Sequence, residues 1–69
     1  MAATEDWDME RLRMRVAAAR RGRDIAVVSR EIGIHASSLH RVEEGELPKV
    51  EALARVCSWL GTTMEEFSR

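Results

Sequence analysis

Apolar side chains recur along the chain at the spacing expected of helices. The apolar sets are Met9, Leu12, Val16 and Ala19; Ile25, Val28 and Ile32; Ala36, Leu39 and Val42; and Val50, Leu53, Val56, Cys57 and Leu60, with Met14, Ala17 and Ala18 widening the first. Intervals of three and four residues place each set on one face of a helix. Tyr, Phe and Thr are scarce, whereas Ala, Leu, Arg, Glu and Met dominate. The pattern therefore predicts an all-α chain.

Turn and capping residues divide this pattern into five short helices. A glycine ends each of the first four, and these glycines are Gly22, Gly33, Gly45 and Gly61. Asp24 is a suitable N-cap for the second helix, and Pro48 suits the first turn of the fourth. Thr63 and Glu66 have capping-box spacing for a short fifth helix. We therefore predict a compact five-helix bundle.

The length of the chain limits how its fold can be stabilised. A domain of 69 residues buries only roughly 60% of its surface on folding. Cys57 is the only cysteine, so no disulfide can form within the chain, and His35 and His40 lack a cysteine pair at zinc spacing. We expect no metal and no cofactor, and stability from helix packing or a partner subunit. The lack of a signal peptide or long apolar run predicts no membrane association and a cytoplasmic location.

Charge is unevenly distributed, although the net charge is only −1. Residues 1–10 carry four acids and no base, whereas residues 11–23 carry six arginines and no acid. We expect residues 1–8 to form a mobile acidic arm, from which Trp7 can dock on the body, and residues 9–69 to form the folded domain. The arginine run permits nucleic-acid binding, but a solvated helix face explains it equally well.

The segment "GIHASSLHRVEEG", residues 33–45, carries small polar residues where a core helix would carry leucines. Two helices of about two turns joined by a short glycine-containing turn form a helix-turn-helix. Here the helices are 25–32 and roughly 36–44, and "GIH" is the turn. Gly33 suits the left-handed backbone that such a turn requires, and Ile34 is expected to anchor the turn to the core. The segment therefore predicts a helix-turn-helix.

Residues 12–67 resemble the Cro/lambda-repressor type of helix-turn-helix domain, also called the XRE family. The matching positions are Ile32, Gly33, Ile34, Leu39, Val42, Glu43, Gly45, Pro48, Leu53, Val56, Leu60 and the terminal turn from Met64 to Phe67. The resemblance implies a sequence-specific regulator of transcription whose recognition helix, starting near Ala36, lies in the major groove of double-stranded DNA. By position, it implies base contacts from Ala36, Ser37, His40 and Arg41, and phosphate contacts from Ser38, the helix start near Ile25 and the Gly45–Lys49 loop.

Some positions depart from the family pattern. Ile25 replaces a phosphate-binding glutamine, and Ser29 replaces a small alanine. Ala18 stands where the family places an arginine partner for Glu43, so that Arg15, Arg20 or Arg21 is left to pair with it, or Glu43 is more exposed. These departures and the acidic "EEGELP" loop leave an alternative open: a protein-interaction module on the same fold, antitoxin-like or regulator-binding, with reduced DNA binding.

The last helices carry aromatic residues that could serve a second role. Trp59 lies off the centre of the apolar stripe of its helix. It is expected either to cover the first helix or Trp7, or to join Met64 and Phe67 in a homodimer contact. Cys57 is interpreted as a small core residue. We expect no enzyme activity, because Ser37, Ser38 and His40 lack an orienting third group, and no small-molecule ligand, because so short a chain is not expected to form a pocket of usual size.

Overall fold

The computed structural model describes residues 7–68, which form four α-helices and one 3₁₀ helix. The elements are α1 (Met9–Arg20), α2 (Ile25–Ile32), α3 (Ala36–Glu43), α4 (Val50–Leu60) and η2 (Met64–Phe67). Within residues 7–68 there is no β-strand, only an isolated bridge between Trp7 and Ser68. The predicted all-α class is confirmed. The predicted count of five helices is not confirmed, because the structure has four α-helices and the fifth element is a single 3₁₀ turn.

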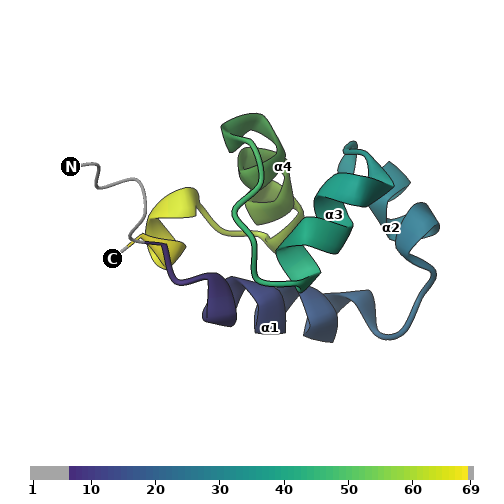
Figure 1. Cartoon of the computed structure of the whole chain (residues 1–69), viewed down its shortest axis with the longest axis horizontal. Coiled ribbons are helices and arrows are strands. Elements are labelled where there is room, and N and C mark those ends of the chain that lie inside the picture. The colour runs from purple at the N-terminus through teal and green to yellow at the C-terminus, as the bar shows by residue number, and fades with distance from the viewer. Residues whose placement is uncertain (1–6, 69) are drawn as a thin grey trace.

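The helices pack around α3, which contacts both α1 and α2 (Figure 1). α4 contacts the same two helices, and η2 lies against α1 and α4. The buried side chains come from every element: Leu12, Val16, Val28, Ile32, Leu39, Val42, Leu53, Val56, Cys57 and Phe67. Burial raises the pKa of the Cys57 thiol, in agreement with a core role. Val50 was expected in the core, but this first residue of α4 is 63% exposed.

The helix ends follow local chemistry with three corrections. Asp24 caps α2 as predicted, accepting from the Ala26 N–H at 2.8 Å. Arg21, one residue before Gly22, is the C-cap of α1, and both residues are left-handed, with φ of 56° and 73°. Pro48 precedes α4 instead of lying in its first turn, because Lys49 is the N-cap residue. Thr63 makes no capping hydrogen bond, so the predicted capping box is wrong.

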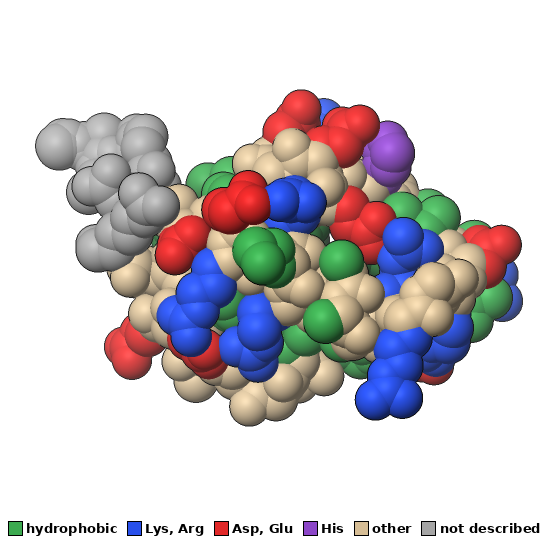
Figure 2. Space-filling model, turned by 90° about the horizontal axis from the view of Figure 1, so that it is seen from below, with side chains coloured by type: hydrophobic (Ala, Val, Ile, Leu, Met, Phe, Trp, Pro, Cys, Tyr) green, Lys and Arg blue, Asp and Glu red, His purple; other side chains and the backbone are tan. Residues whose placement is uncertain are grey.

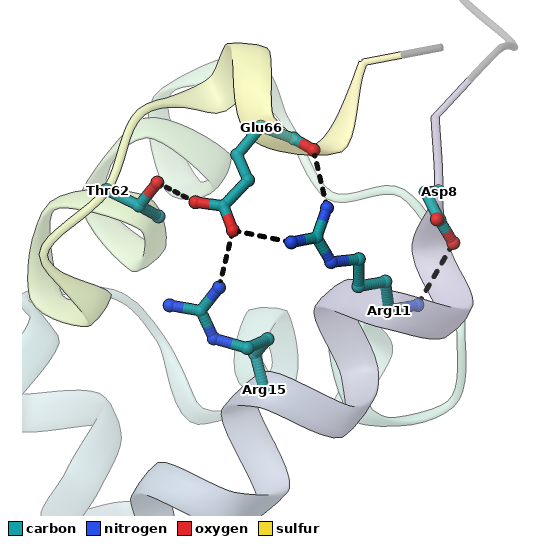
Figure 3. Close-up of polar contacts among 5 residues, drawn as sticks. All are labelled: Asp8, Arg11, Arg15, Thr62 and Glu66. Carbon is teal, nitrogen blue, oxygen red and sulfur yellow. Dashed lines mark hydrogen bonds and ion pairs between the residues drawn. The ribbon is translucent and has the colours of Figure 1, made fainter.

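The Glu66 side chain instead joins the C-terminal segment to α1 (Figure 3). It accepts from the Thr62 hydroxyl, from Arg11 at 2.8 Å and from Arg15 at 2.7 Å. The Thr62 hydrogen bond, with further contributions from the two arginines, holds the pKa of Glu66 below its ordinary value. One carboxylate therefore connects the first helix to the last turn.

Residues 7 and 8 belong to the folded body rather than to an arm. Trp7 packs against the core and pairs with Ser68. The Asp8 N–H donates to the Phe67 carbonyl at 2.7 Å, and its side chain caps α1 through the Arg11 N–H at 3.1 Å. The boundary expected at residue 8 is therefore corrected, and the rest of the expected arm, residues 1–6, lies outside the described residues.

Candidate nucleic-acid interface

The turn between α2 and α3 has the geometry that the sequence predicts. Gly33 has φ of 92°, in the left-handed region, and its N–H donates to the Ser29 carbonyl at 2.8 Å. The Ile34 N–H donates to the same carbonyl at 3.0 Å, and its half-buried side chain packs against the core. A Cβ at Gly33 would lie 3.1 Å from Nη1 of Arg55, the end of an exposed side chain that can move aside, so it is the left-handed backbone that favours glycine here.

The Ser29 hydroxyl, at a position where the family has alanine, is buried but satisfied. It donates to the Ala26 carbonyl at 3.0 Å within α2. Ile25, where the family has glutamine, is half-buried against the core. The serine at position 29 is thus accommodated by a local hydrogen bond. The isoleucine at position 25, in contrast, leaves the start of α2 without a polar side chain at that position.

α3 has a buried face and an exposed one. Leu39 and Val42 are fully buried and hold the helix to the core. Among the residues expected to contact DNA, Ala36, Ser37, His40 and Arg41 are exposed, and Ser38 is half-buried. Ala36, which the apolar pattern placed inward, therefore lies on the outer face. The outer surface of α3 is small and polar, and no other described element covers it.

A groove of 250 Å³ runs beside the N-terminal half of α3. Its lining comprises His35, Ser37, Ser38, Arg41, Pro48 and Lys49. A second hollow of 340 Å³ shares His35, Ser38 and Lys49 with it and adds Arg55 from α4 and the acidic Glu51. We call these two together the α3 groove. The structure thus brings four of the six expected contact residues, Ser37, Ser38, Arg41 and Lys49, to one groove. Ala36 and His40 lie outside its lining.

The cations of the α3 groove have no acidic partner. Within residues 7–68, the side chains of Arg41, Lys49 and Arg55 form no ion pair or hydrogen bond. Arg55 was missed by the sequence reasoning, because nothing in its local sequence sets it apart from other polar positions on α4. His40 is engaged differently, since its Nε2 lies 3.1 Å from Glu44, an ion pair when the ring is protonated.

The arginines of α1 and of the turn after it are largely neutralised. Their ion pairs are Arg11–Glu66, Arg13–Glu10, Arg15–Glu66, Arg20–Glu43 and Arg23–Glu31. Arg21 is the exception, because it has no partner among the described residues. The arginines of residues 11–23 therefore mostly form ion pairs with carboxylates of the same chain. Figure 2, which views the α1 side, shows basic side chains beside acidic ones on this face.

Arg20 is the arginine that pairs with Glu43. Nη2 donates to Oε1 at 3.0 Å, and Nε lies 2.7 Å from Oε2. The shorter contact is an ion pair without hydrogen-bond alignment, since both of its atoms lack a hydrogen-bond partner. Arg20 is two positions beyond Ala18, where the family arginine would stand. A link between α1 and α3 is therefore made about half a helical turn further along α1.

The three residues expected at a homodimer contact differ in how far they are buried. Phe67 is fully buried, so the expectation that it anchors a homodimer is wrong. It fills the core under Arg11 and Arg15, whose guanidinium carbons lie 5.7 and 5.8 Å from its ring centroid. Trp59 and Met64 are half-buried against the core. Their role in a homodimer stays a prediction.

The described residues contain no group of three or more His, Cys, Asp or Glu side chains placed to hold a metal ion. Within this part of the chain, no helix combines the length and the apolar character needed to cross a bilayer.

α2 packs one face against the core, Gly33 provides a left-handed turn, and α3 exposes a polar face. This arrangement defines a helix-turn-helix, a class of DNA-binding domain. The family pattern of the helix-turn-helix domain matches residues 10–69, and the chain belongs to this family. The match agrees with the resemblance to the Cro/lambda-repressor type. No curated protein and no solved structure matches the chain significantly.

Proposed function

We propose that this protein is a sequence-specific regulator of transcription that places α3 in the major groove of double-stranded DNA. The observation that carries the proposal is the exposed polar face of α3, with the unpaired Arg41 beside the unpaired Lys49 in one groove. An α-helix fits the major groove of B-DNA. Side chains that pair with nothing in the protein can bind DNA without first breaking a contact.

The side chains at the groove suit different parts of a duplex. Arg41 can donate two hydrogen bonds to one guanine edge, the commonest specific contact in the major groove. Ser37 can bond to several bases, and the exposed methyl of Ala36 suits a thymine methyl. Lys49, Ser38 and Arg55 also line the groove and suit phosphates. In this proposal Arg41 supplies most of the sequence preference and Lys49 supplies affinity.

The decisive experiment is a binding selection from random duplexes, followed by affinity measurements on the enriched site at several salt concentrations. We expect an enriched site containing guanine, and a logarithm of affinity that falls linearly with the logarithm of salt by about 0.9 per phosphate contact. A scrambled duplex of the same length is the control. Enrichment of no site, together with no binding to any duplex at low salt, would contradict the proposal.

Homodimerisation on DNA and action in the cytoplasm are part of the proposal. Proteins of this type gain affinity when two copies bind half-sites about one helical turn apart. The half-buried Trp59 and Met64 are the remaining candidates for the contact between copies. We expect a palindromic site, and weaker self-association after Trp59→Ala. Sedimentation of both proteins as monomers, with and without DNA, would remove the dimer from the proposal.

A second candidate function is favoured by the surface that follows α3. Leu47 is 41% exposed and Val50 is 63% exposed, on either side of Lys49, and Glu44 and Glu46 are exposed nearby. Apolar side chains beside carboxylates suit a protein partner better than a phosphate backbone. We propose on this basis an antitoxin-like or regulator-binding module as the alternative. It predicts that duplex binding is absent, or does not vary with salt.

A further inference from the structure

A separate hollow lies between the C-terminal halves of α1 and α4. Its volume is 820 Å³, and it shares no lining residue with the α3 groove. The hollow is larger than we expect for so short a chain, but it is open to solvent rather than enclosed. An open surface of this size suits an extended or helical peptide better than a small molecule, which needs most of its surface buried.

The floor of this hollow is apolar. It is made by Ala18 and Ala19 from α1 and by Trp59 and Leu60 from α4. The indole N–H of Trp59 donates to Oε1 of Glu31 at 3.3 Å, which helps to fix the orientation of the ring in this floor. Figure 2 shows apolar side chains exposed between basic ones on the α1 side of the molecule. A partly exposed tryptophan is a frequent anchor of protein–protein contacts.

The rim of the hollow is basic. Three of its lining residues are Arg15, Arg21 and Arg23, and none is acidic. Arg23 is engaged by Glu31 and by the Arg20 carbonyl. Arg15 donates to Glu66 through Nη1 alone, and Arg21 is exposed and unpaired among residues 7–68. Arg21 is therefore the guanidinium of this hollow that is free to bind a carboxylate beside the apolar floor.

We propose that this hollow binds an acidic amphipathic segment of a partner protein, with an apolar side chain against Trp59 and a carboxylate on Arg21. Amphipathic helices dock in this way when an apolar floor is rimmed by opposite charge. A second copy of this chain fits less well, because a two-fold contact centred here would oppose the same arginines. Duplex DNA fits less well too, because its phosphate backbone gains nothing from the apolar floor. Since the α3 groove is elsewhere, DNA and this partner can be bound at once, whereas a homodimer contact through Trp59 would compete with the partner for this hollow.

The test uses a synthetic peptide of roughly three helical turns, with leucines on one face and glutamates on the other. Binding to the full chain is followed by amide NMR shifts, and by tryptophan fluorescence in a Trp7→Phe background that leaves Trp59 as the only reporter. We expect shifts at the C-terminal halves of α1 and α4 and not at α3. A peptide with glutamine in place of each glutamate should bind roughly tenfold more weakly, and it tests charge without altering the protein.

The matched variants are Arg21→Glu and Arg30→Glu. Both arginines are exposed and unpaired in the described part of the chain, but only Arg21 lines the hollow. We expect Arg21→Glu to weaken peptide binding by roughly tenfold and Arg30→Glu to leave it unchanged, with equal unfolding midpoints.

Four results would overturn the proposal. The first is no shift at millimolar peptide, and the second is shifts centred on α3. The third is an equal loss of peptide binding in both variants. The fourth is self-association that Arg21→Glu abolishes, which would make a second copy the occupant. None of these results bears on DNA binding, which is measured separately with duplexes.

Discussion

Most basic residues in the described part of this protein fall into two groups that differ in what they contact. The paired arginines lie on α1 and in the turn after it, and each meets a carboxylate of the same chain. The free cations of the α3 groove, Arg41, Lys49 and Arg55, meet none within residues 7–68. The first group is dense and conspicuous in the sequence, whereas the second is spread over α3, the following loop and α4.

The comparison shows that the density of basic residues in a sequence is a poor guide to an interface. An arginine already paired with a carboxylate must break that contact before it can bind a phosphate, so its net gain is small. An unpaired cation on an exposed groove loses only its hydration. We therefore expect the paired arginines to act mainly on stability, and the free cations to act mainly on binding.

The largest effect is expected at the partly buried pair of Arg20 and Glu43, whose side chains are 25% and 17% exposed. Arg20→Ala should lower the free energy of unfolding by roughly 2 to 3 kcal/mol, because it leaves a half-buried carboxylate unpaired. Chemical denaturation measures this change. Arg13→Ala, which removes an exposed pair within α1, is the control and should change stability little. Equal losses of unfolding free energy in Arg20→Ala and Arg13→Ala would show that the ion pair between Arg20 and Glu43 has no special role in stability.

A smaller effect is expected at Arg41, and it should appear in binding rather than in stability. Arg41→Ala should weaken binding to the selected site by about 2 kcal/mol and relax the preference at one base position, while leaving affinity for random duplex nearly unchanged. Fluorescence anisotropy on both duplexes measures the difference. Arg30→Ala removes an equal charge from α2 and serves as the control. An unchanged preference after Arg41→Ala would assign base recognition to another residue.

Lys49 should have a weaker effect that does not depend on sequence. Lys49→Ala should reduce affinity for all duplexes by the same factor and lower the slope against the logarithm of salt by about 1. The same titration on Arg13→Ala should leave the slope unchanged, because that charge is already paired with Glu10. If the two variants had equal slopes, free and paired cations would not differ as we propose.

The smallest effect concerns acid stability at Glu66. Its folded-state pKa is lowered from an ordinary 4.5, first by the Thr62 hydrogen bond. A carboxylate whose folded-state pKa is lowered stabilises the folded protein at pH values above its ordinary pKa. This contribution is lost as the pH falls through the folded-state pKa. Glu66→Gln should therefore be less stable than the natural chain at neutral pH, with the gap narrowing below about pH 4.5. Thermal unfolding against pH tests this, with the exposed neighbour Glu65→Gln as control. A gap that stays constant into acid would show that Glu66 acts through packing.

Much of the fold and part of the candidate site follow from the sequence alone. The helix positions, the N-cap at Asp24 and the left-handed turn at Gly33 depend on residues within one or two turns of each other. The outward position of Ser37 and Arg41 follows from the same periodicity once Leu39 and Val42 are placed inward. Local rules of this kind need no knowledge of the rest of the chain.

Only the tertiary structure decided which charges meet and which remain free. Glu43 had three possible arginine partners in the sequence, and the packing of α3 on α1 selected Arg20, 23 positions away. Glu66 meets Arg11 and Arg15 across 55 and 51 positions, and the same approach of η2 to α1 buries Phe67. Pairings over such distances depend on how the helices are oriented in space, which helical periodicity does not determine.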